Sequence, residues 1–131
     1  MDPVTVLMGA LSAIGATIGE KAIRDGYDAL KGFLVKKFGG NNPRLAERID
    51  DYVQDPETFA KPAEKSLRES GAAQDKDVVD RVMELLNQAN AVKPVPAMLI
   101  ANLKAVQSNV SVVGGNVYGG VTFGSPPTQR G

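Results

Sequence analysis

The chain has 131 residues, and its fifteen basic side chains balance its fifteen acidic ones. Because no net field draws it to a polyanion, we expect no nucleic-acid partner. It contains neither cysteine nor histidine, which excludes disulfides, thiol nucleophiles, imidazole bases and the usual zinc and haem ligand sets. We therefore expect no enzyme activity, no cofactor and no metal site. The first apolar run lacks a basic flank before it, so we expect a cytoplasmic protein.

The first predicted helix lies in an uncharged run, residues 4–18, between Asp2 and Glu20. Asp2 is expected to cap it and Pro3 to occupy its first turn. Large apolar side chains recur at helical spacing, and small residues at small-xxx-small spacing line the other face. The run spans roughly 22 Å, less than the roughly 30 Å of a bilayer's hydrocarbon core. It is therefore either the buried central helix of a bundle or a membrane-active helix, and one protein can have both in different states. The residues assigned to it are Val4, Leu7, Met8, Leu11, Ile14, Gly15, Ile18 and Gly19.

Residues 20–38 continue the helical pattern in amphipathic form, so residues 3–38 make up the first helical unit. The expected inner stripe is Ile23, Tyr27, Leu30, Leu34 and Phe38. On the outer face, Lys21 with Asp25 and Arg24 with Asp28 have the spacing of ion pairs.

Two Xaa-Pro pairs predict further helix starts, Asn42-Pro43 and Asp55-Pro56. Pro62 is expected to break or kink the helix that Asp55 begins, and Gly71 to end it. Asp75 or Asp77 begins a further helix that extends to about residue 87. These patterns predict an all-α fold with a four-helix-bundle-like domain over residues 1–91.

The composition changes at Ala91. The segment 93–96, Lys-Pro-Val-Pro, predicts a stiff linker. The apolar piece 97–106 that follows is either a short helix or an extended lead-in, so we describe residues 92–107 as a linker with room for one short helix. Residues 125–131 begin with a Ser-Pro-Pro sequence, which cannot continue a strand ladder, and are predicted to be a disordered tail.

Residues 108–124 carry short β-prone runs, cut by Gly-Gly pairs, and no charge. Such a segment orders well when identical copies stack in register, whereas one copy alone is expected to be disordered or to form a hairpin. A flexible glycine-rich tail and the last hairpin of an ordinary sheet are the alternatives. The residues assigned to this amyloid motif are Val110, Val112, Val113, Gly114, Gly115, Asn116, Val117, Tyr118, Gly119, Gly120, Val121, Phe123 and Gly124.

Both ends of the chain resemble one known family. VVGGNVYGGVTFG, residues 112–124, looks like the bacterial amyloid signalling motifs that end effector proteins and match a motif on an NLR-type sensor. Residues 6–39, VLMGALSAIGATIGEKAIRDGYDALKGFLVKKFG, look like the bacterial Bell domain, a relative of fungal HeLo-type and mixed-lineage-kinase-like execution domains. The related animal motif of RIP-type kinases is not matched, because Asn116 lies too close to Gly114 and Gly115.

The resemblance implies a membrane-permeabilising effector of bacterial programmed cell death in NLR-associated immunity. A sensor presents an amyloid template, the tail stacks on it, and the crowded bundles expose the first helix to the inner membrane. The implied partners are further copies of the chain, the NLR-type sensor and inner-membrane lipid. The protein is then cytoplasmic when inactive and at the inner membrane when activated. The alternative is a non-lytic polymerising adaptor or structural scaffold whose tail stacks and whose bundle recruits a partner.

Overall fold

The structure is a computed structural model that describes residues 2–114, with side chains described as far as residue 110. All regular elements in this part of the chain are helical, which confirms the predicted all-α fold class. In chain order they are α1 (Pro3–Gly15), α2 (Lys21–Phe38), α3 (Leu45–Gln54), α4 (Pro56–Ser70), the short 3-10 helix η1 (Ala72–Gln74), α5 (Lys76–Val92) and α6 (Ala97–Gly114).

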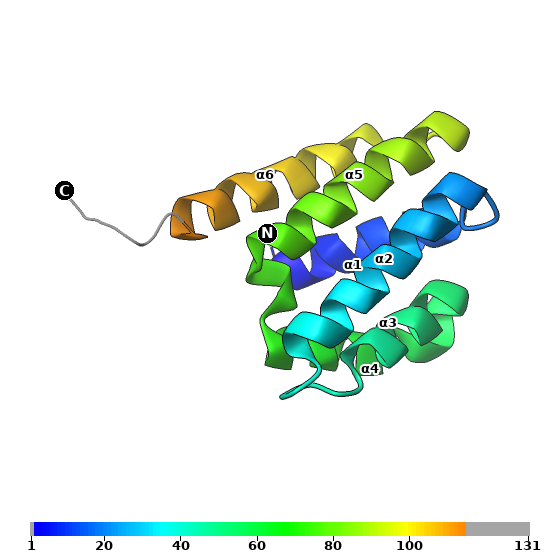
Figure 1. The fold of residues 1–131 in the computed structure, drawn as a ribbon. Helices are drawn as coiled ribbons and strands as arrows, with labels where there is room; N and C mark the ends of the chain where they lie inside the picture. Colours follow the sequence, from blue (N-terminus) through cyan, green and yellow to red (C-terminus); the bar gives the residue numbers. More distant parts are fainter. Residues whose placement is uncertain (1, 115–131) are drawn as a thin grey trace.

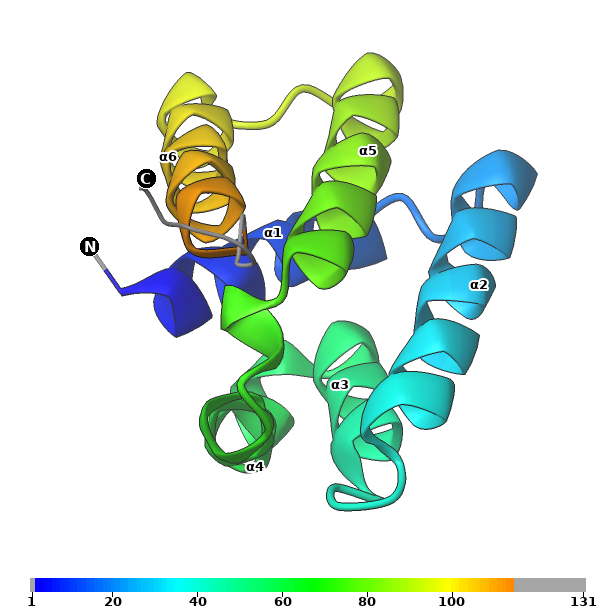
Figure 2. The same cartoon turned by 60° about the vertical axis from the view of Figure 1, so that its left-hand side comes forward.

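Helix α1 lies at the centre of the molecule. It contacts α3, α4, η1, α5 and α6, whereas α2 contacts α3 and α5. Figures 1 and 2 show α5 and α6 side by side on one side of α1, and α3 and α4 on the opposite side. The remaining flank is occupied by α2 (Figure 2). Because one helix touches almost all the others, its apolar side chains form the middle of the core.

Aspartate side chains begin three helices, as the sequence predicts. Asp2, Asp55 and Asp75 each accept a hydrogen bond from a backbone amide two or three residues further on, at 3.0, 3.4 and 3.1 Å. These bonds satisfy amides that have no partner inside the first turn. Gly71 ends α4 with a φ of 75°, a left-handed conformation that glycine adopts without strain.

The prediction that Asn42 caps the third helix is wrong. Asn42 and Pro43 form a turn in which the Asn42 carbonyl accepts a hydrogen bond from the Leu45 amide (3.1 Å), and α3 begins at Leu45. Arg44 holds the capping position without a side-chain hydrogen bond. The Xaa-Pro pattern therefore marks the approach to the helix and not its first turn.

Pro62 does not break α4, which runs from Pro56 to Ser70 with Pro62 inside it. A proline removes one backbone hydrogen bond from a helix interior. The next turns of α4 place Ala63 and Leu67 in the core, both 0 % exposed. Packing of this face against the rest of the protein keeps the helix continuous across the missing bond.

Helices α2 to α5 each have an apolar stripe that faces the core. Phe38, expected on the inner stripe of α2, and Phe59 are half-buried and pack against the edge of the core. The buried members of the stripes are Ile23, Tyr27, Leu30, Leu34, Leu45, Ile49, Tyr52, Val53, Leu67, Val78, Val82, Leu85, Leu86 and Ala89.

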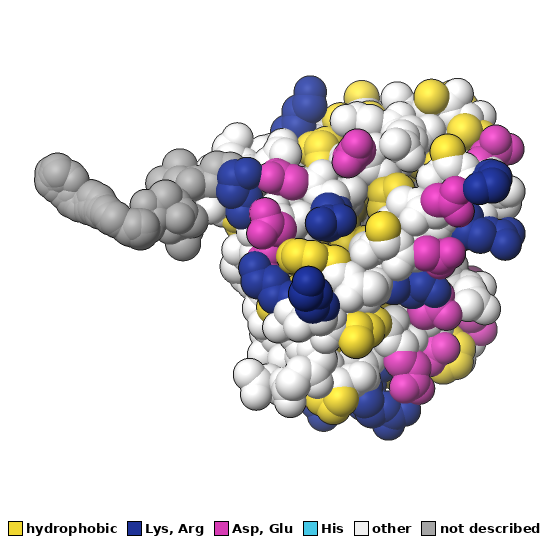
Figure 3. All heavy atoms as spheres, in the orientation of Figure 1, with side chains coloured by type: hydrophobic (Ala, Val, Ile, Leu, Met, Phe, Trp, Pro, Cys, Tyr) yellow, Lys and Arg dark blue, Asp and Glu magenta, His cyan; other side chains and the backbone are white. Residues whose placement is uncertain are grey.

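The outer face of α2 and α5 carries charges of both signs, interspersed with a few apolar side chains (Figure 3). An ion pair joins Lys37 near the end of α2 to Asp75, the N-cap of α5. The guanidinium of Arg81 lies 4.5 Å from the centroid of the Phe33 ring, a cation–π contact that covers part of the aromatic surface. The ion pair and the cation–π contact on this face therefore hold α2 against α5 outside the core.

Candidate functional site

The helix predicted to act on membranes is hidden in the core. Val4, Leu7, Leu11 and Ile14 are each at most 2 % exposed, and Met8 is 8 % exposed. These five side chains point at the helices that surround α1 and form the centre of the buried cluster. In this structure α1 therefore takes the role of the buried central helix, which is one of the two roles that the sequence allowed.

Helix α1 is shorter than expected and ends at Gly15, so Ile18 and Gly19 lie in the turn that leads to α2. The Thr17 hydroxyl donates a hydrogen bond to the Ile14 carbonyl (2.9 Å) at this end, which pairs one of the carbonyls that the helix leaves open. The ion pair that the sequence predicts between Arg24 and Asp28 does not form. Arg24 Nε donates instead to the Ile18 carbonyl (3.4 Å) and ties the turn to α2.

Small residues on α1 allow the neighbouring helices to approach closely. A Cβ atom on Gly15 would lie 2.9 Å from both the carbonyl oxygen and Cγ1 of Val53 in α3. A Cβ on Gly9 would lie 3.2 Å from Leu99 Cδ1 in α6. Nothing lies within 4 Å of a Cβ on Gly19. In this structure the small face serves packing within the bundle, at Gly15 against backbone and at Gly9 against a side chain.

A buried hydrogen bond also anchors α1 to α3. The Tyr52 hydroxyl donates to the Met8 carbonyl of α1 (3.1 Å), and burial raises the pKa of this phenol. The protonated hydroxyl therefore remains a donor over the physiological pH range. Displacement of α1 would leave this donor without its partner, at the cost of an unpaired buried group.

Helix α6 covers the opposite side of α1. Leu103, Val106 and Val110 recur at helical spacing and are 0, 2 and 5 % exposed. Leu99 and Ile100 are half-buried against the same core. A polar contact fixes the register, because Gln107 Nε2 donates to Asp80 Oδ1 of α5 at 2.8 Å. Residues 97–106 therefore belong to the bundle, and the segment between α5 and α6 is shorter than the predicted linker.

The first residues of the predicted amyloid motif belong to α6 in this single chain. Val110 is buried in the core, and Val112, Val113 and Gly114 continue the helix backbone. The predicted residues from Gly115 to Gly124 lie outside the described part of the chain. A 3-4 spacing of Leu99, Leu103, Val106 and Val110 was the sequence signal for this helix. The β-prone valines and glycines that follow obscured it.

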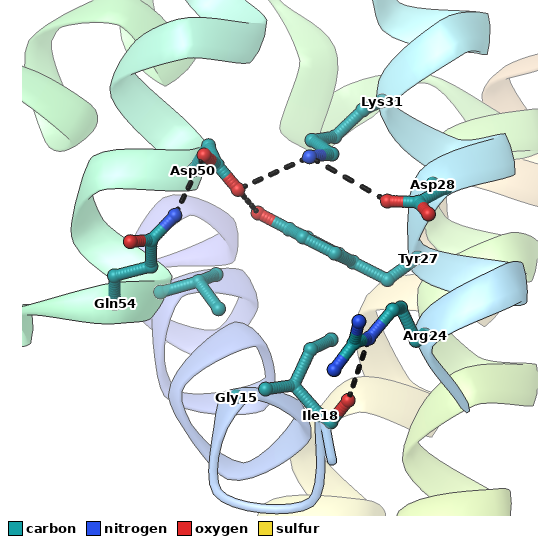
Figure 4. A pocket seen from close by; sticks show the side chains of 9 residues that line it. Gly15, Ile18, Arg24, Tyr27, Asp28, Lys31, Asp50 and Gln54 are labelled. Atoms are coloured by element: carbon teal, nitrogen blue, oxygen red, sulfur yellow. Dashed lines mark hydrogen bonds and ion pairs between the residues drawn. The ribbon is translucent and has the colours of Figure 1, made fainter. Parts of the chain in front are cut away.

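A polar cluster around Asp50 links α2 to α3 beside the end of α1 (Figure 4). Asp50 Oδ1 accepts hydrogen bonds from the Tyr27 hydroxyl (2.9 Å) and Lys31 Nζ (3.2 Å), and its Oδ2 accepts one from Gln54 Nε2 (2.8 Å). Burial, reinforced by the hydrogen bond to Asp50, raises the pKa of Tyr27 well above its usual value, so the hydroxyl stays a donor. The cluster borders a cavity of about 470 Å³.

In the described part of the chain, no group of three or more carboxylates is placed to hold a metal ion. None of the described helices has the length and hydropathy needed to cross a membrane. The features that stand out are thus the buried α1, its cover α6 and the cavity beside the turn that follows α1.

Comparison with known protein families identifies the family of the chain. Residues 1–126 match the family model described as the Het-E N-terminal domain. The chain belongs to the Het-E N-terminal domain family. This is a HeLo-like family associated with cell death. The HeLo-like part of the predicted resemblance is thereby confirmed, whereas the bacterial Bell assignment and the amyloid motif stay predictions. No curated protein and no solved structure matches the chain.

The match to the Het-E N-terminal domain extends beyond the described helices. It includes α6 and the whole glycine-rich segment, residues 108–124, and ends at residue 126. The helical bundle and the segment that follows it therefore lie within one family unit. Within that unit, α6 is the element that touches the buried α1 and also leads directly into the glycine-rich segment.

Proposed function

We propose that this HeLo-like protein is an amyloid-gated effector of cell death that permeabilises the bacterial inner membrane. One observation carries the proposal. Val110 is a buried residue of α6, 5 % exposed, and is also the first of the residues assigned to the predicted stacking motif. The same side chain cannot stay in the core of the monomer and join a cross-β stack. Stacking that begins at Val110 therefore pulls on the helix that covers α1.

The energy for this exchange comes from the stack. A buried valine contributes about 1.5 kcal/mol or more to folding, and unwinding the end of α6 also breaks its intrahelical backbone hydrogen bonds. In a stack of identical copies, each backbone group regains partners above and below, and each layer buries the next. Association of many copies therefore offsets the folding free energy that each monomer loses when its Val110 leaves the core.

Removal of α6 would uncover one side of α1. This helix has 13 residues, which at about 1.5 Å per residue is about 20 Å. A single copy is too short for the roughly 30 Å hydrocarbon core. Copies concentrated on a fibril would act together, either by thinning the bilayer or by forming an oligomeric lesion. The proposed partners are other copies of this chain, an NLR-type sensor with a matching motif and inner-membrane lipid. No catalytic step is part of the proposal.

A chemical lock between α5 and α6 tests this mechanism. The wild-type chain has no cysteine, so Asp80→Cys with Gln107→Cys introduces the only two thiols, at positions whose side chains are in contact (2.8 Å). A short bifunctional thiol reagent would then join α6 to α5. We expect the joined protein to add to fibrils of a peptide of residues 108–124 without releasing dye from vesicles of phosphatidylethanolamine and phosphatidylglycerol. The same protein before joining should release the dye.

The controls separate stacking from membrane attack. Val121→Pro removes a ladder donor from the predicted stack and lies outside the described helices, so this variant should neither add to the fibrils nor release dye. Val112→Pro is less suitable because residue 112 also belongs to α6. Equal dye release before and after joining would contradict the proposed role of α6. Addition to fibrils without dye release in either form would select the adaptor or scaffold alternative.

A further inference from the structure

The cavity beside the α1–α2 turn has the size of a small-molecule site. Its volume is about 470 Å³, within the roughly 300–1,000 Å³ usual for ligand pockets. Helix α2 forms one wall and α3 the other, while Gly15 and Ile18 close the side nearest to α1 (Figure 4). A molecule in this cavity would touch three successive segments of the chain.

Most of the charge in the cavity is already paired. Asp50 accepts hydrogen bonds from Tyr27, Lys31 and Gln54, at distances between 2.8 and 3.2 Å. Lys31 Nζ also lies 3.6 Å from a carboxylate oxygen of Asp28. These groups satisfy one another, with the lysine held between the two carboxylates. A ligand gains little by competing with them.

Arg24 is the exception. Its Nε donates to the Ile18 carbonyl (3.4 Å), and no ion pair joins its guanidinium to a carboxylate in the described part of the chain. Figure 4 shows the guanidinium between Tyr27 and Ile18, at the edge of the cavity. A guanidinium presents its remaining N–H groups as a planar fork that fits two oxygens of a carboxylate or phosphate.

Next to this charge the cavity is apolar. Val53 is 7 % exposed, Ile18 is half-buried against the core, and Gly15 contributes no side chain. We propose that the cavity binds a small amphipathic anion. A carboxylate or phosphate monoester group of this ligand pairs with Arg24, and a short alkyl chain lies against Ile18 and Val53. Such an anion can be a free acyl compound or the headgroup region of a lipid.

Binding of this anion would stabilise the closed bundle. A ligand that binds only the folded state adds a stabilisation that grows with the logarithm of its concentration. Because it would bridge α2 and α3 to the turn after α1, it would also oppose the release of α1, a consequence that rests on the proposed function. Binding itself requires neither fibrils nor membrane damage, so the two proposals fail independently.

Titration calorimetry on the full chain tests the site with defined probes. Sodium octanoate and octyl phosphate are expected to bind and to raise the melting temperature in proportion to the logarithm of their concentration. Neutral 1-octanol and inorganic phosphate, which each lack one half of the ligand, are expected to bind at least about tenfold more weakly. Arg24→Gln should weaken octanoate binding by at least about tenfold, and octanoate should no longer raise the melting temperature of this variant above its own value without ligand. Lys21→Gln is the matched control, because Lys21 is on the same helix but its side chain is 89 % exposed and pairs with Asp25.

A second arm with vesicles identifies the source of the anion. Octanoate binding in solution that depends on Arg24 indicates a free acyl anion. Arg24-dependent binding seen only with phosphatidylglycerol vesicles, and not with phosphatidylcholine vesicles, indicates a lipid headgroup. The proposal is overturned if Arg24→Gln binds as tightly as the wild type, if octanol binds as well as octanoate, or if neither arm shows binding.

Discussion

Truncation of Leu103 tests whether α6 is part of the core that hides α1. Leu103 is 0 % exposed and lies on the face of α6 that packs against the bundle. Leucine-to-alanine changes at buried sites cost about 2–5 kcal/mol, because apolar contact is lost and a cavity is left. We expect Leu103→Ala to lower the free energy of unfolding by an amount in this range. The matched control is Met98→Ala on the same helix, where the side chain is 73 % exposed and truncation should change stability by no more than about 0.5 kcal/mol.

Urea unfolding followed by circular dichroism measures the loss of stability, and amide hydrogen exchange locates it. A loss of about 2.8 kcal/mol corresponds to an exchange rate about a hundredfold higher for amides that open with the whole domain. We expect α1 and α6 amides to be affected together, because α6 covers α1. Equal urea midpoints for Leu103→Ala and Met98→Ala would refute the reasoning. Faster exchange in α6 with no change in α1 would refute the coupling between the two helices.

Two further predictions concern the packing of α1 and the response to acid. Gly15→Ala should cost about 1–3 kcal/mol through overpacking, because the new Cβ would lie 2.9 Å from the Val53 carbonyl oxygen. Gly32→Ala, where nothing lies within 4 Å of the new Cβ, should instead raise stability by about 0.5–1 kcal/mol. Thermal melts in which both variants shift the melting temperature in the same direction would contradict this. The hydrogen bond from Lys76, followed by that from Gln107, holds the pKa of Asp80 below its ordinary value of 3.8. The stability from this carboxylate is therefore present above the unfolded-state pKa and is lost as the pH falls through the lower folded-state pKa. Asp80→Asn should lose less stability than the wild type between pH 6 and pH 3, and parallel urea midpoints for the two proteins over that range would count against the assignment.

Short-range signals predicted the helix boundaries best. Asp2, Asp55 and Asp75 cap helices as their patterns indicated, and Gly71 ends α4 in the left-handed conformation. A cap depends on a side chain and an amide only a few residues apart, so the sequence contains nearly all the information. The same kind of signal failed at Asn42, where the turn preceding α3 takes up the capping residue.

Longer-range packing overrode local preference at Pro62 and in α6. Pro62 stays inside a helix whose next turns are anchored in the core by Ala63 and Leu67. In α6, β-prone valines and a glycine continue a helix whose preceding residues, among them Val106 and Val110, are buried against the bundle. Secondary-structure preference is worth tenths of a kcal/mol per residue, whereas burial of one large apolar side chain is worth about 1.5–3 kcal/mol. Burial therefore decides such segments.

By itself, the sequence determined that this protein is helical, which faces of its helices are apolar and where most helices begin. These properties follow from periodicity and capping, which act within a few residues. Only the tertiary structure decided that α1 is the central helix, that α6 covers it, and that Val110 belongs to both the core and the predicted motif. Burial depends on which segments meet in space, and neighbours far apart in the chain leave no local pattern. The cavity beside Arg24 has the same origin, because its walls come from three segments that only folding brings together.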